Sequence, residues 1–314
     1  MTEFPKHFDG KKFFNPNAPQ ARGPFDAMKW KLKTRPEPSR FMDDVQPTKP
    51  PANPPDNDSQ IRVTLINHST VLLQQAGLNI LTDPIWSERA SPFAWIGPKR
   101  LRQPGVRWDD LPRIDIALIS HNHYDHLDLA TLRRLAKRDA PRFVVPIGLA
   151  RLLEKNGISR VQELDWGDSL PMERTTIHSV PAMHFSARGA FDRNRTLWCG
   201  YVLEPPGGAV YFAADTGFGD HFAWIKERFG PPRLALLPIG AYEPRWFMGP
   251  IHMAPEQALQ AHKILNAQTS IAIHHGTFQM ADDGLDTAKK VLNTCAPGDS
   301  FLTLNNGQSL TLAP

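Results

Sequence analysis

The chain carries a dense run of metal-binding residue types at positions 121–126, where the sequence reads His-Asn-His-Tyr-Asp-His. This run follows the apolar segment 114–120 directly. Imidazole nitrogen and carboxylate oxygen together suit a borderline divalent cation, zinc first and then manganese or iron, rather than a soft copper site or an all-oxygen calcium site. A polar surface turn is the alternative, but a chance match to this pattern has a probability on the order of one in a thousand or lower. We therefore interpret 121–126 as a metal-binding segment at the end of a strand.

A centre that holds two ions needs further donors, and single candidates follow three predicted strands downstream. His184 comes shortly after an apolar stretch, Asp215 ends the run 210–215, and His274 follows 271–273. Taken singly, each is more simply explained as a cap, a turn residue or a hydrogen-bonded core residue. Taken together with 121–126, all of them stand near the C-terminal ends of strands, where ligands are expected.

The elements that must position these residues are strands and helices mixed along the chain from residue 61 onward. Apolar and alternating runs predict strands at 61–66, 71–74, 79–82, 114–120, 144–146, 175–180, 197–203, 209–213, 234–237 and 270–273. Helical patterns cover 127–137, 148–156, 223–229, 255–265 and 284–293. Asp128 is placed to cap the first of these helices, and Gly157 to end the second. The mixture predicts one layered domain of the α/β or α+β class.

Residues 1–60 differ from the rest of the chain because they are rich in proline. We predict an N-terminal arm with little regular structure, packed on the body because its aromatic residues argue against full disorder. Residues 61–314 then form the catalytic domain. Of the cysteines, Cys199 lies in an apolar run and Cys295 has no partner at metal-ribbon spacing, so a buried Cys199 thiol is expected.

The charge pattern bears on partners and location. The net charge is +4, and basic residues concentrate at 6–35 and 99–107 with aromatic residues beside them, a pattern shared by lipid-binding, nucleic-acid-binding and simply packed segments. No run approaches the ~20 apolar residues of a membrane span, and residues 1–10 lack the apolar core of a signal peptide. We expect a cytoplasmic protein that binds membranes peripherally and does not bind nucleic acid, and we leave a homodimer open. The candidate membrane surface comprises the arm together with Trp86, Phe93, Trp95 and Ile96, near Lys99 and Arg100.

The order of the donors resembles that of the metallo-β-lactamase fold, and longer segments resemble one of its branches, the N-acylphosphatidylethanolamine-hydrolysing phospholipase D family. These segments are 81–87 (LTDPIWS), 89–92 (RASP), 97–100 (GPKR), 239–248 (IGAYEPRWFM), 252–256 (HMAPE) and 274–278 (HHGTF). They are spread over most of residues 60–280. His275 is a departure, because tryptophan is expected there in the lipid-cleaving enzymes, so the acyl-chain and head-group preference does not follow from the resemblance.

The resemblance implies a four-layer αββα sandwich with its ligands gathered at one edge of two sheets. It also implies two zinc ions, one held by His121, His123 and His184, the other by Asp125, His126 and His274, with Asp215 bridging them. Such a pair activates water and binds the oxygens of a phosphodiester. The implied reaction releases N-acylethanolamine and leaves phosphatidate, with Asp125 orienting the attacking water.

Further residues receive expected roles. His252 is the candidate for supplying a proton to the leaving alkoxide, or it is a surface residue before a helix that begins at Pro255. His68 is expected near the cleft, as a support for a ligand or as a core residue, and Tyr124 as a phosphate contact or a cover for its loop. Tyr242, Arg245, Trp246 and Phe247 form either a wall for a lipid or part of the core. His7, His178, His221 and His262 have no expected role.

Two other functions compete with the lipid hydrolase. One is a hydrolase of the same fold that acts on a soluble lactone or cyclic phosphodiester, because one fold hosts many reactions. The other is a non-catalytic protein that binds lipid or nucleic acid. The complete ligand set disfavours the latter, since a binding module has no use for activated water.

Overall fold

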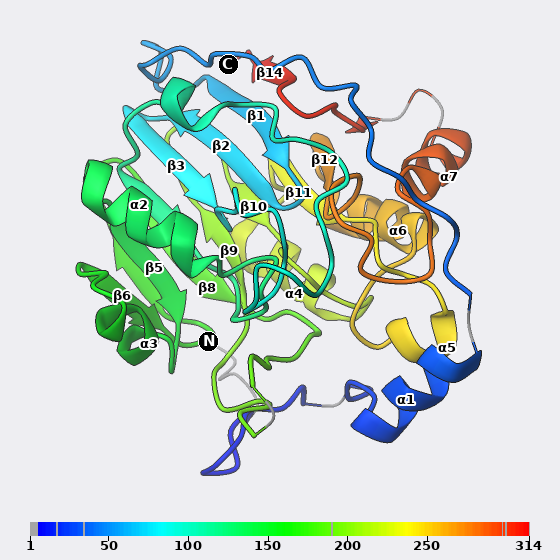
Figure 1. The fold of residues 1–314 in the computed structure, drawn as a ribbon. Helices are drawn as coiled ribbons and strands as arrows, with labels where there is room; N and C mark the ends of the chain where they lie inside the picture. Colours follow the sequence, from blue (N-terminus) through cyan, green and yellow to red (C-terminus); the bar gives the residue numbers. More distant parts are fainter. Residues whose placement is uncertain are drawn as a thin grey trace.

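The structure, a computed structural model, describes residues 6–16, 18–33, 35–189, 191–296, 298 and 300–313. Two seven-stranded sheets lie face to face, and helices cover both outer faces (Figure 1). This arrangement is the αββα sandwich, so the predicted fold class is confirmed.

The first sheet has the strand order β14-β1-β2-β3-β4-β5-β6. Its strands are β1 (Ile61–Asn67), β2 (Thr70–Gln75), β3 (Leu78–Thr82), β4 (Ile116–Leu118), β5 (Arg142–Pro146), β6 (Val161–Leu164) and β14 (Ser309–Leu312). β3 to β6 run parallel to one another. Parallel strands are usually covered on both faces, and β3, β4 and β5 are accordingly almost entirely buried.

The second sheet has the order β13-β12-β11-β10-β9-β8-β7. Its strands are β7 (Ser169–Pro171), β8 (Thr176–Val180), β9 (Gly200–Leu203), β10 (Val210–Phe212), β11 (Leu234–Pro238), β12 (Thr269–Ile273) and β13 (Phe301–Leu302). β10 to β13 are parallel, and β8 points the same way because it is antiparallel to β9, which is antiparallel to β10. The C-terminal ends of these strands therefore share one edge of the sheet.

Three apolar layers hold the sandwich together. One fills the space between the sheets and includes Trp198 and Phe212. A second lies under α2 (Leu129–Asp139) and α3 (Ala150–Lys155). The third lies under α4 (His221–Phe229), α6 (Pro255–Leu265) and α7 (Thr287–Cys295). Burial of this much apolar surface stabilises the sheets and holds the strand ends at fixed positions.

The N-terminal region contains more regular structure than predicted. Helix α1 (Pro24–Lys33) lies in the segment that was expected to be irregular, so that expectation was wrong for these residues. The helix is held by tertiary contacts: the Trp30 ring stacks on Phe247 at 5.0 Å between centroids, and Trp30 Nε1 donates to Asp282 at 2.9 Å. Contacts of this kind override local propensity and are not visible in the sequence.

Other segments between residues 6 and 48 also contact the body. The buried amide of Asn15 donates to the carbonyl of His184 at 2.9 Å and accepts from Trp198 Nε1 at 3.1 Å. Further along, Met42 forms a β-bridge with Arg102, and Thr48 forms one with Val106. One of these contacts reaches the backbone of a residue that the sequence predicted to bind metal.

Several short elements escaped prediction, and several predicted boundaries shifted. β6, β7, β13, β14, the short α5 (Arg245–Met248) and the 3₁₀ turn Trp108–Asp110 were not expected. β6, β7 and β14 are partly exposed and lack a continuous apolar run. β4 ends at Leu118 and not at residue 120, so the chain leaves the sheet directly before the metal-binding segment. The predicted cap is confirmed, because Asp128 accepts from Ala130 N at the start of α2. None of the helices in the described ranges is long and apolar enough to span a bilayer.

Candidate metal centre

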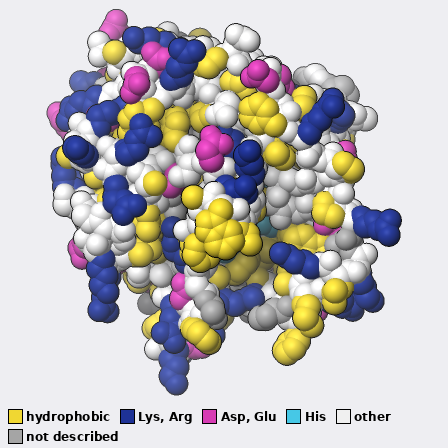
Figure 2. Space-filling view, in the orientation of Figure 1, with side chains coloured by type: hydrophobic (Ala, Val, Ile, Leu, Met, Phe, Trp, Pro, Cys, Tyr) yellow, Lys and Arg dark blue, Asp and Glu magenta, His cyan; other side chains and the backbone are white. Residues whose placement is uncertain are grey.

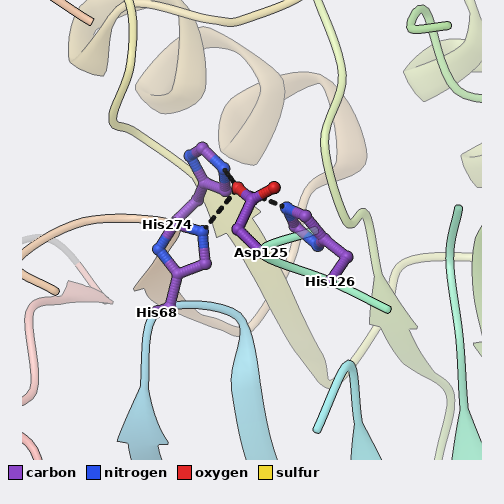
Figure 3. A group of neighbouring side chains, drawn as sticks. All are labelled: His68, Asp125, His126 and His274. Atoms are coloured by element: carbon purple, nitrogen blue, oxygen red, sulfur yellow. Dashed lines mark hydrogen bonds and ion pairs between the residues drawn. The ribbon is translucent and has the colours of Figure 1, made fainter. Parts of the chain in front are cut away.

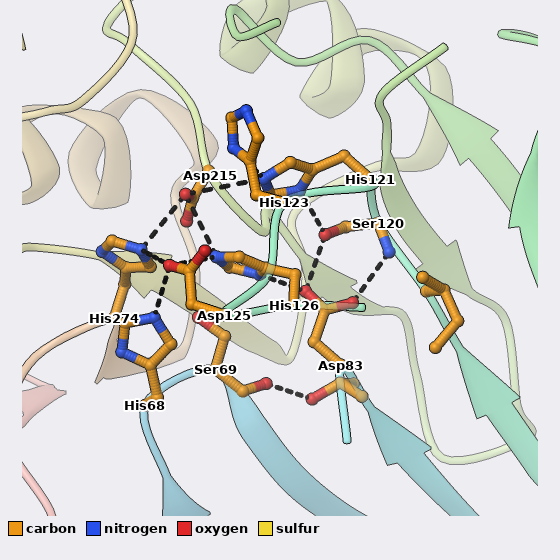
Figure 4. Close-up of polar contacts among 12 residues, drawn as sticks. His68, Ser69, Asp83, Ser120, His121, His123, Asp125, His126, Asp215 and His274 are labelled. Atoms are coloured by element: carbon orange, nitrogen blue, oxygen red, sulfur yellow. Dashed lines mark hydrogen bonds and ion pairs between the residues drawn. The ribbon is translucent and has the colours of Figure 1, made fainter. Parts of the chain in front are cut away.

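The side chains predicted to bind metal lie together at the edge where the parallel strands end, and Figure 4 labels all of them except His184. The segment 121–126 follows β4, and His184 follows β8. Asp215 lies just beyond β10, and His274 comes directly after β12. The relevant strands run in one direction within each sheet, and each loop therefore delivers its side chain to the same place.

One group of donors consists of three imidazoles. His121 Nε2 lies 2.8 Å from His123 Nδ1, which lies 3.2 Å from His184 Nε2. Burial lowers the pKa of His123 to about 3 and that of His184 to about 4, and it holds the pKa of His121 well below its usual value. Neutral nitrogens at these distances repel one another unless a proton or cation lies among them. The group is suited to a divalent cation.

The second group surrounds the carboxylate of Asp125 (Figure 3). Its Oδ2 atom lies 3.3 Å from His126 Nε2, 3.4 Å from His274 Nε2 and 3.0 Å from His68 Nε2. The potential ligand atoms of these side chains all lie within 4.8 Å of one another. His68 is thus drawn into the site as a hydrogen-bond partner of Asp125, in keeping with a residue that supports a ligand.

Asp215 lies between the two groups. Its Oδ2 atom is 3.2 Å from His126 Nε2 and 3.1 Å from His274 Nε2 in one group. It is also 3.9 Å from His121 Nε2 and 3.7 Å from His184 Nε2 in the other. A carboxylate in this position is within reach of two ions at once, as the bridging role assigned from the sequence requires.

The buried carboxylates of the cluster need positive charge close to them. Burial alone would raise the pKa values of Asp125 and Asp215, but His126 and His274 outweigh it and hold both well below the usual range. Conversely, burial would lower the pKa of His126, yet Asp215, Asp125 and Asp83 raise it well above its ordinary value. The same balance raises the pKa of His274 to about 9. Without metal, protons supply the charge that a divalent cation would supply in their place.

Several potential ligand atoms of the cluster also have no hydrogen-bond partner. His126 Nε2, His274 Nε2 and Asp215 Oδ1 are buried and make no hydrogen bond, and buried polar atoms without a partner are rare in proteins. These observations fit two divalent cations, one among His121, His123 and His184 and the other among Asp125, His126 and His274, with Asp215 shared.

Comparison with known proteins agrees with this geometry. Residues 78–275 match the family described as "Beta-lactamase superfamily domain". The chain belongs to the metallo-β-lactamase superfamily. It is 41% identical over 235 residues to N-acyl-phosphatidylethanolamine-hydrolyzing phospholipase D 1 of Caenorhabditis elegans, with 71% of this chain and 66% of that protein covered.

Three further similarities concern the same region. The mitochondrial N-acyl-phosphatidylethanolamine-hydrolyzing phospholipase D of Saccharomyces cerevisiae is 39% identical over 232 residues, which cover 72% of this chain and 49% of the yeast protein. The match thus spans from about half to two thirds of the length of these relatives. The metallo hydrolase Igni18 of Ignicoccus hospitalis has a TM-score of 0.61 at 23% identity, with 81% of this chain and 99% of that chain covered. The "UPF0173 metal-dependent hydrolase MK1542" of Methanopyrus kandleri is 29% identical over 252 residues, which cover 79% of this chain and 99% of that protein.

Asp83, to which the sequence assigned no role, holds the predicted metal ligand His126 in place by a hydrogen bond to the ring nitrogen that faces away from the cluster. Asp83, directly after β3, accepts from His126 Nδ1 at 2.7 Å, and it also accepts from the Ser120 hydroxyl at 2.6 Å and the Ser120 amide at 2.8 Å. These bonds fix the tautomer and orientation of the His126 ring. Its position after a buried strand and inside the segment 81–87 was the only signal in the sequence.

His252 lies beside the cluster, although it was assigned from the sequence as a proton donor and not as a ligand. Its ring centroid is 5.1 Å from that of His184 and 5.2 Å from that of His274. Burial holds the pKa of His252 well below its usual value. The ring is therefore neutral in the absence of metal and is placed to donate a hydrogen bond into the site.

A cavity of about 290 Å³ opens onto the cluster from the surface. Its walls are largely apolar and come from α1, α5 and neighbouring loops, while His123, Asp125, Asp215, His252 and His274 border its floor. The apolar wall residues include Trp30, Phe185, Ala241, Phe247, Met248 and Met280. Phe247 is therefore both packed and exposed to this cavity, so the two roles considered for it are compatible.

The remaining residues named from the sequence lie around the centre. Tyr124 borders the cavity, and its hydroxyl donates to the carbonyl of Arg188 at 2.8 Å. The histidines without an expected role lie outside the cluster, where His7 pairs with Asp165, His178 with Glu204, His221 with Thr216 and His262 with Ser270.

The prediction of a membrane surface was wrong in part. Arg100 is fully buried, where its guanidinium donates to the carbonyls of Ser87 and Ile85. The Trp86 indole donates to the carbonyl of Val106 and packs edge-on against Trp108. Arg100 is therefore not available to a lipid surface, whereas Trp86 stays partly exposed.

Proposed function

We propose that this protein is a phospholipase D-type hydrolase that cleaves N-acylphosphatidylethanolamine-like lipids into N-acylethanolamine and phosphatidate with two zinc ions. The observation that carries the proposal is a buried His and Asp cluster at the floor of an apolar cavity. Such a site combines the chemistry for a phosphodiester with walls for acyl chains. The identity to the C. elegans and yeast phospholipases supports the same substrate class.

The residues that would hold the ions are those of the two groups described above. Two zinc ions, when bound, supply Lewis-acid activation of a phosphodiester and a nucleophilic water at neutral pH. Asp125 is held from three sides by imidazoles, so its carboxylate has a fixed orientation from which it can align that water. Asp83 and His68 contribute by fixing His126 and Asp125 rather than by touching the substrate.

His252 is the proposed donor to the leaving group. The N-acylethanolamine oxygen departs as a strongly basic alkoxide unless a proton reaches it. His252 borders the floor of the same cavity, together with Asp125 and Asp215. A neutral imidazole there can donate its N–H hydrogen bond to the departing oxygen.

Access from a membrane is the second part of the proposal. The outer face of α1 exposes Phe25, Met28 and Leu32, which are spaced by three and four residues and so form one stripe, while Trp30 on the same helix lines the cavity. On another side of the cavity, the segment 91–97 exposes Phe93, Trp95 and Ile96, and Trp95 is 74% exposed.

The apolar groups of α1 and 91–97 support an interfacial location. Figure 2 shows a hydrophobic cluster beside a hollow on this face, with basic side chains around it. Exposed aromatic and aliphatic side chains beside lysines and arginines are typical of peripheral membrane binding. The substrate would then enter the cavity directly from the lipid surface.

A substrate panel tests the proposed function. Zinc-loaded protein is assayed with N-acylphosphatidylethanolamine, a set of lactones and bis(p-nitrophenyl) phosphate, with Asp215→Asn as the variant that removes the bridging charge. We expect phosphatidate and N-acylethanolamine to form with the wild type and not with the variant. Turnover of lactones alone would replace the lipid by a soluble substrate, and no activity on any diester at full zinc content would refute the phosphodiesterase.

A further inference from the structure

A second cavity adjoins the metal centre on the other side of Tyr124. Its volume is about 430 Å³, and Tyr124 borders both this cavity and the one that opens onto the metal ligands. Three arginines, Arg89, Arg133 and Arg188, line it. Nothing in the reaction proposed above uses these guanidinium groups.

In the described part of the chain, the guanidinium groups of these three arginines are not neutralised by an ion pair, unlike that of Arg102. Among the described residues, the guanidinium of Arg102 pairs with Asp44 and Asp286, whereas the guanidinium nitrogens of Arg89, Arg133 and Arg188 have no carboxylate oxygen within 4 Å in the described ranges. The backbone amide of Arg188 donates to Asp192 at 3.0 Å.

The carboxylates of Asp128 and Glu88 also line the cavity and offset the charge of the three arginines only in part. Asp128 uses its oxygens to accept from Ala130 N, Thr131 Oγ1 and Ser87 N at the start of α2. Glu88, which also lines the cavity, is exposed and forms no ion pair with a described residue. The wall therefore presents a surplus of positive charge.

Arg188 is the best placed of the three. Its Nη1 donates to the carbonyls of Asn122 at 3.0 Å and Leu127 at 2.8 Å, and its guanidinium lies 4.0 Å from the centre of the Tyr124 ring. These contacts fix the guanidinium at the boundary between the two cavities. Burial lowers the pKa of Arg188 but leaves it a cation at neutral pH. A desolvated cation with only carbonyl acceptors attracts an anionic oxygen.

The surroundings indicate where such an anion comes from. Phe93 lines this cavity and belongs, with Trp95 and Ile96, to the exposed apolar segment 91–97. If these side chains enter the acyl region of a bilayer, the cavity lies at the level of the phosphate groups. A free phosphate ester has the same charge but requires no apolar neighbour.

We propose that the cavity lined by Arg89, Arg133 and Arg188 binds the headgroup phosphate of an anionic phospholipid that is not the substrate. The bound lipid would anchor the segment 91–97 and hold the mouth of the metal site on the membrane. This inference rests on the lipid-directed function proposed above. It adds a binding site for a second lipid.

The test is vesicle sedimentation with the full chain and two matched variants. Arg133→Gln removes an exposed guanidinium of the cavity, and Arg134→Gln removes the exposed neighbouring guanidinium on α2, which lies over Trp108 and outside the cavity. The vesicles contain phosphatidylcholine alone or phosphatidylcholine with phosphatidylglycerol, and no N-acylated lipid. Arg133→Lys keeps the charge without the forked geometry.

We expect Arg133→Gln to weaken binding to the phosphatidylglycerol vesicles about fivefold, and Arg134→Gln to weaken it much less. Arg133→Lys should lie between the wild type and Arg133→Gln, and all proteins should bind pure phosphatidylcholine alike. Equal losses in the two Gln variants, or no preference of the wild type for phosphatidylglycerol, would overturn the site.

A second arm separates a lipid from a free anion. Glycerol phosphate is added to the wild type and to Arg133→Gln, and the thermal midpoint is measured. Stabilisation of the wild type alone, combined with equal vesicle binding of both proteins, would assign the cavity to a soluble phosphate ester and contradict the lipid. Vesicle binding is read without turnover, so its failure is distinct from a failure of the lipid hydrolysis assay.

Discussion

His68 Nε2 lies 3.0 Å from Oδ2 of Asp125, and both side chains are buried. His68 sits in the turn between β1 and β2, and its carbonyl accepts from the amide of His274 at 2.9 Å. His68 therefore holds in place one predicted metal ligand that follows a strand of each sheet, Asp125 in the first and His274 in the second. Burial lowers the pKa of His68 to about 3, so the ring is neutral and its Nε2–H donates to the carboxylate.

The first prediction concerns this hydrogen bond. His68→Ala should lower turnover roughly 10- to 100-fold, because Asp125 loses the donor that fixes its orientation. His68→Asn, which keeps a donor, should recover part of the loss. Steady-state kinetics with zinc content measured on the same samples checks this, with His178→Ala as a control for the loss of a histidine that pairs far from the cluster with Glu204. Equal effects of His68→Ala and His178→Ala would show that His68 has no special part in the site.

The second prediction concerns Asp83, which holds His126 from the side opposite the metal. Asp83→Asn keeps the shape but loses an acceptor for His126 Nδ1 or Ser120, so the affinity for the ion at Asp125 and His126 should fall roughly 10- to 100-fold. The folded state should lose about 1–3 kcal/mol, because a buried donor is left without a partner. Competition with a metal chelator measures the first effect and urea unfolding of the metal-free protein the second. Unchanged metal affinity would contradict the proposed support.

The third prediction concerns His252. His252→Ala should reduce turnover roughly 10²- to 10³-fold, the range for loss of one hydrogen-bond donor to a developing oxyanion, while both ions remain bound. A substrate whose leaving group is a phenol needs less protonation, so bis(p-nitrophenyl) phosphate should be affected much less than the lipid. If both substrates lose the same factor, His252 acts on the metal site or the fold and not on the leaving group.

The fourth prediction concerns the buried thiol. Burial raises the pKa of Cys199 to about 12, so the reactive thiolate is scarce at every pH below that value and increases only as the pH approaches it. With Cys295→Ser leaving Cys199 as the single thiol, a disulfide reagent at pH 8 should label the protein only after unfolding. Rapid labelling of the native protein would show that the space between the sheets is open to reagent.

The residues that could be predicted from the sequence are those whose signal is local. In the segment 121–126 the ligand types and their spacing lie within six consecutive residues. Asp215 and His274 each follow an apolar run that forms a buried strand. Asp128 caps α2 because a cap depends only on the residues that follow it. Once the strands were located, the direction of the parallel strands was enough to bring these side chains together.

The residues that escaped prediction depend on contacts between distant segments. His68 was expected near the cleft, but its partner Asp125 was not predicted. The contact forms because the β1–β2 turn lies next to the end of β12 across the two sheets, and no pattern around residue 68 encodes that neighbour. Helix α1 forms in a proline-rich stretch because Trp30 finds Phe247 and Asp282. The same limitation explains why Arg100, beside basic and aromatic residues in sequence, was placed on the surface although it is buried under Phe278.

The central claim is that water attacks phosphorus and expels N-acylethanolamine at the site of Asp125 and Asp215. The most direct test is hydrolysis of N-acylphosphatidylethanolamine by the zinc-loaded protein in ¹⁸O-labelled water, with both products analysed by mass spectrometry. The proposed reaction puts the label in phosphatidate and none in N-acylethanolamine. Label in N-acylethanolamine, release of a labelled fatty acid, or no cleavage by fully metallated protein would contradict the claim.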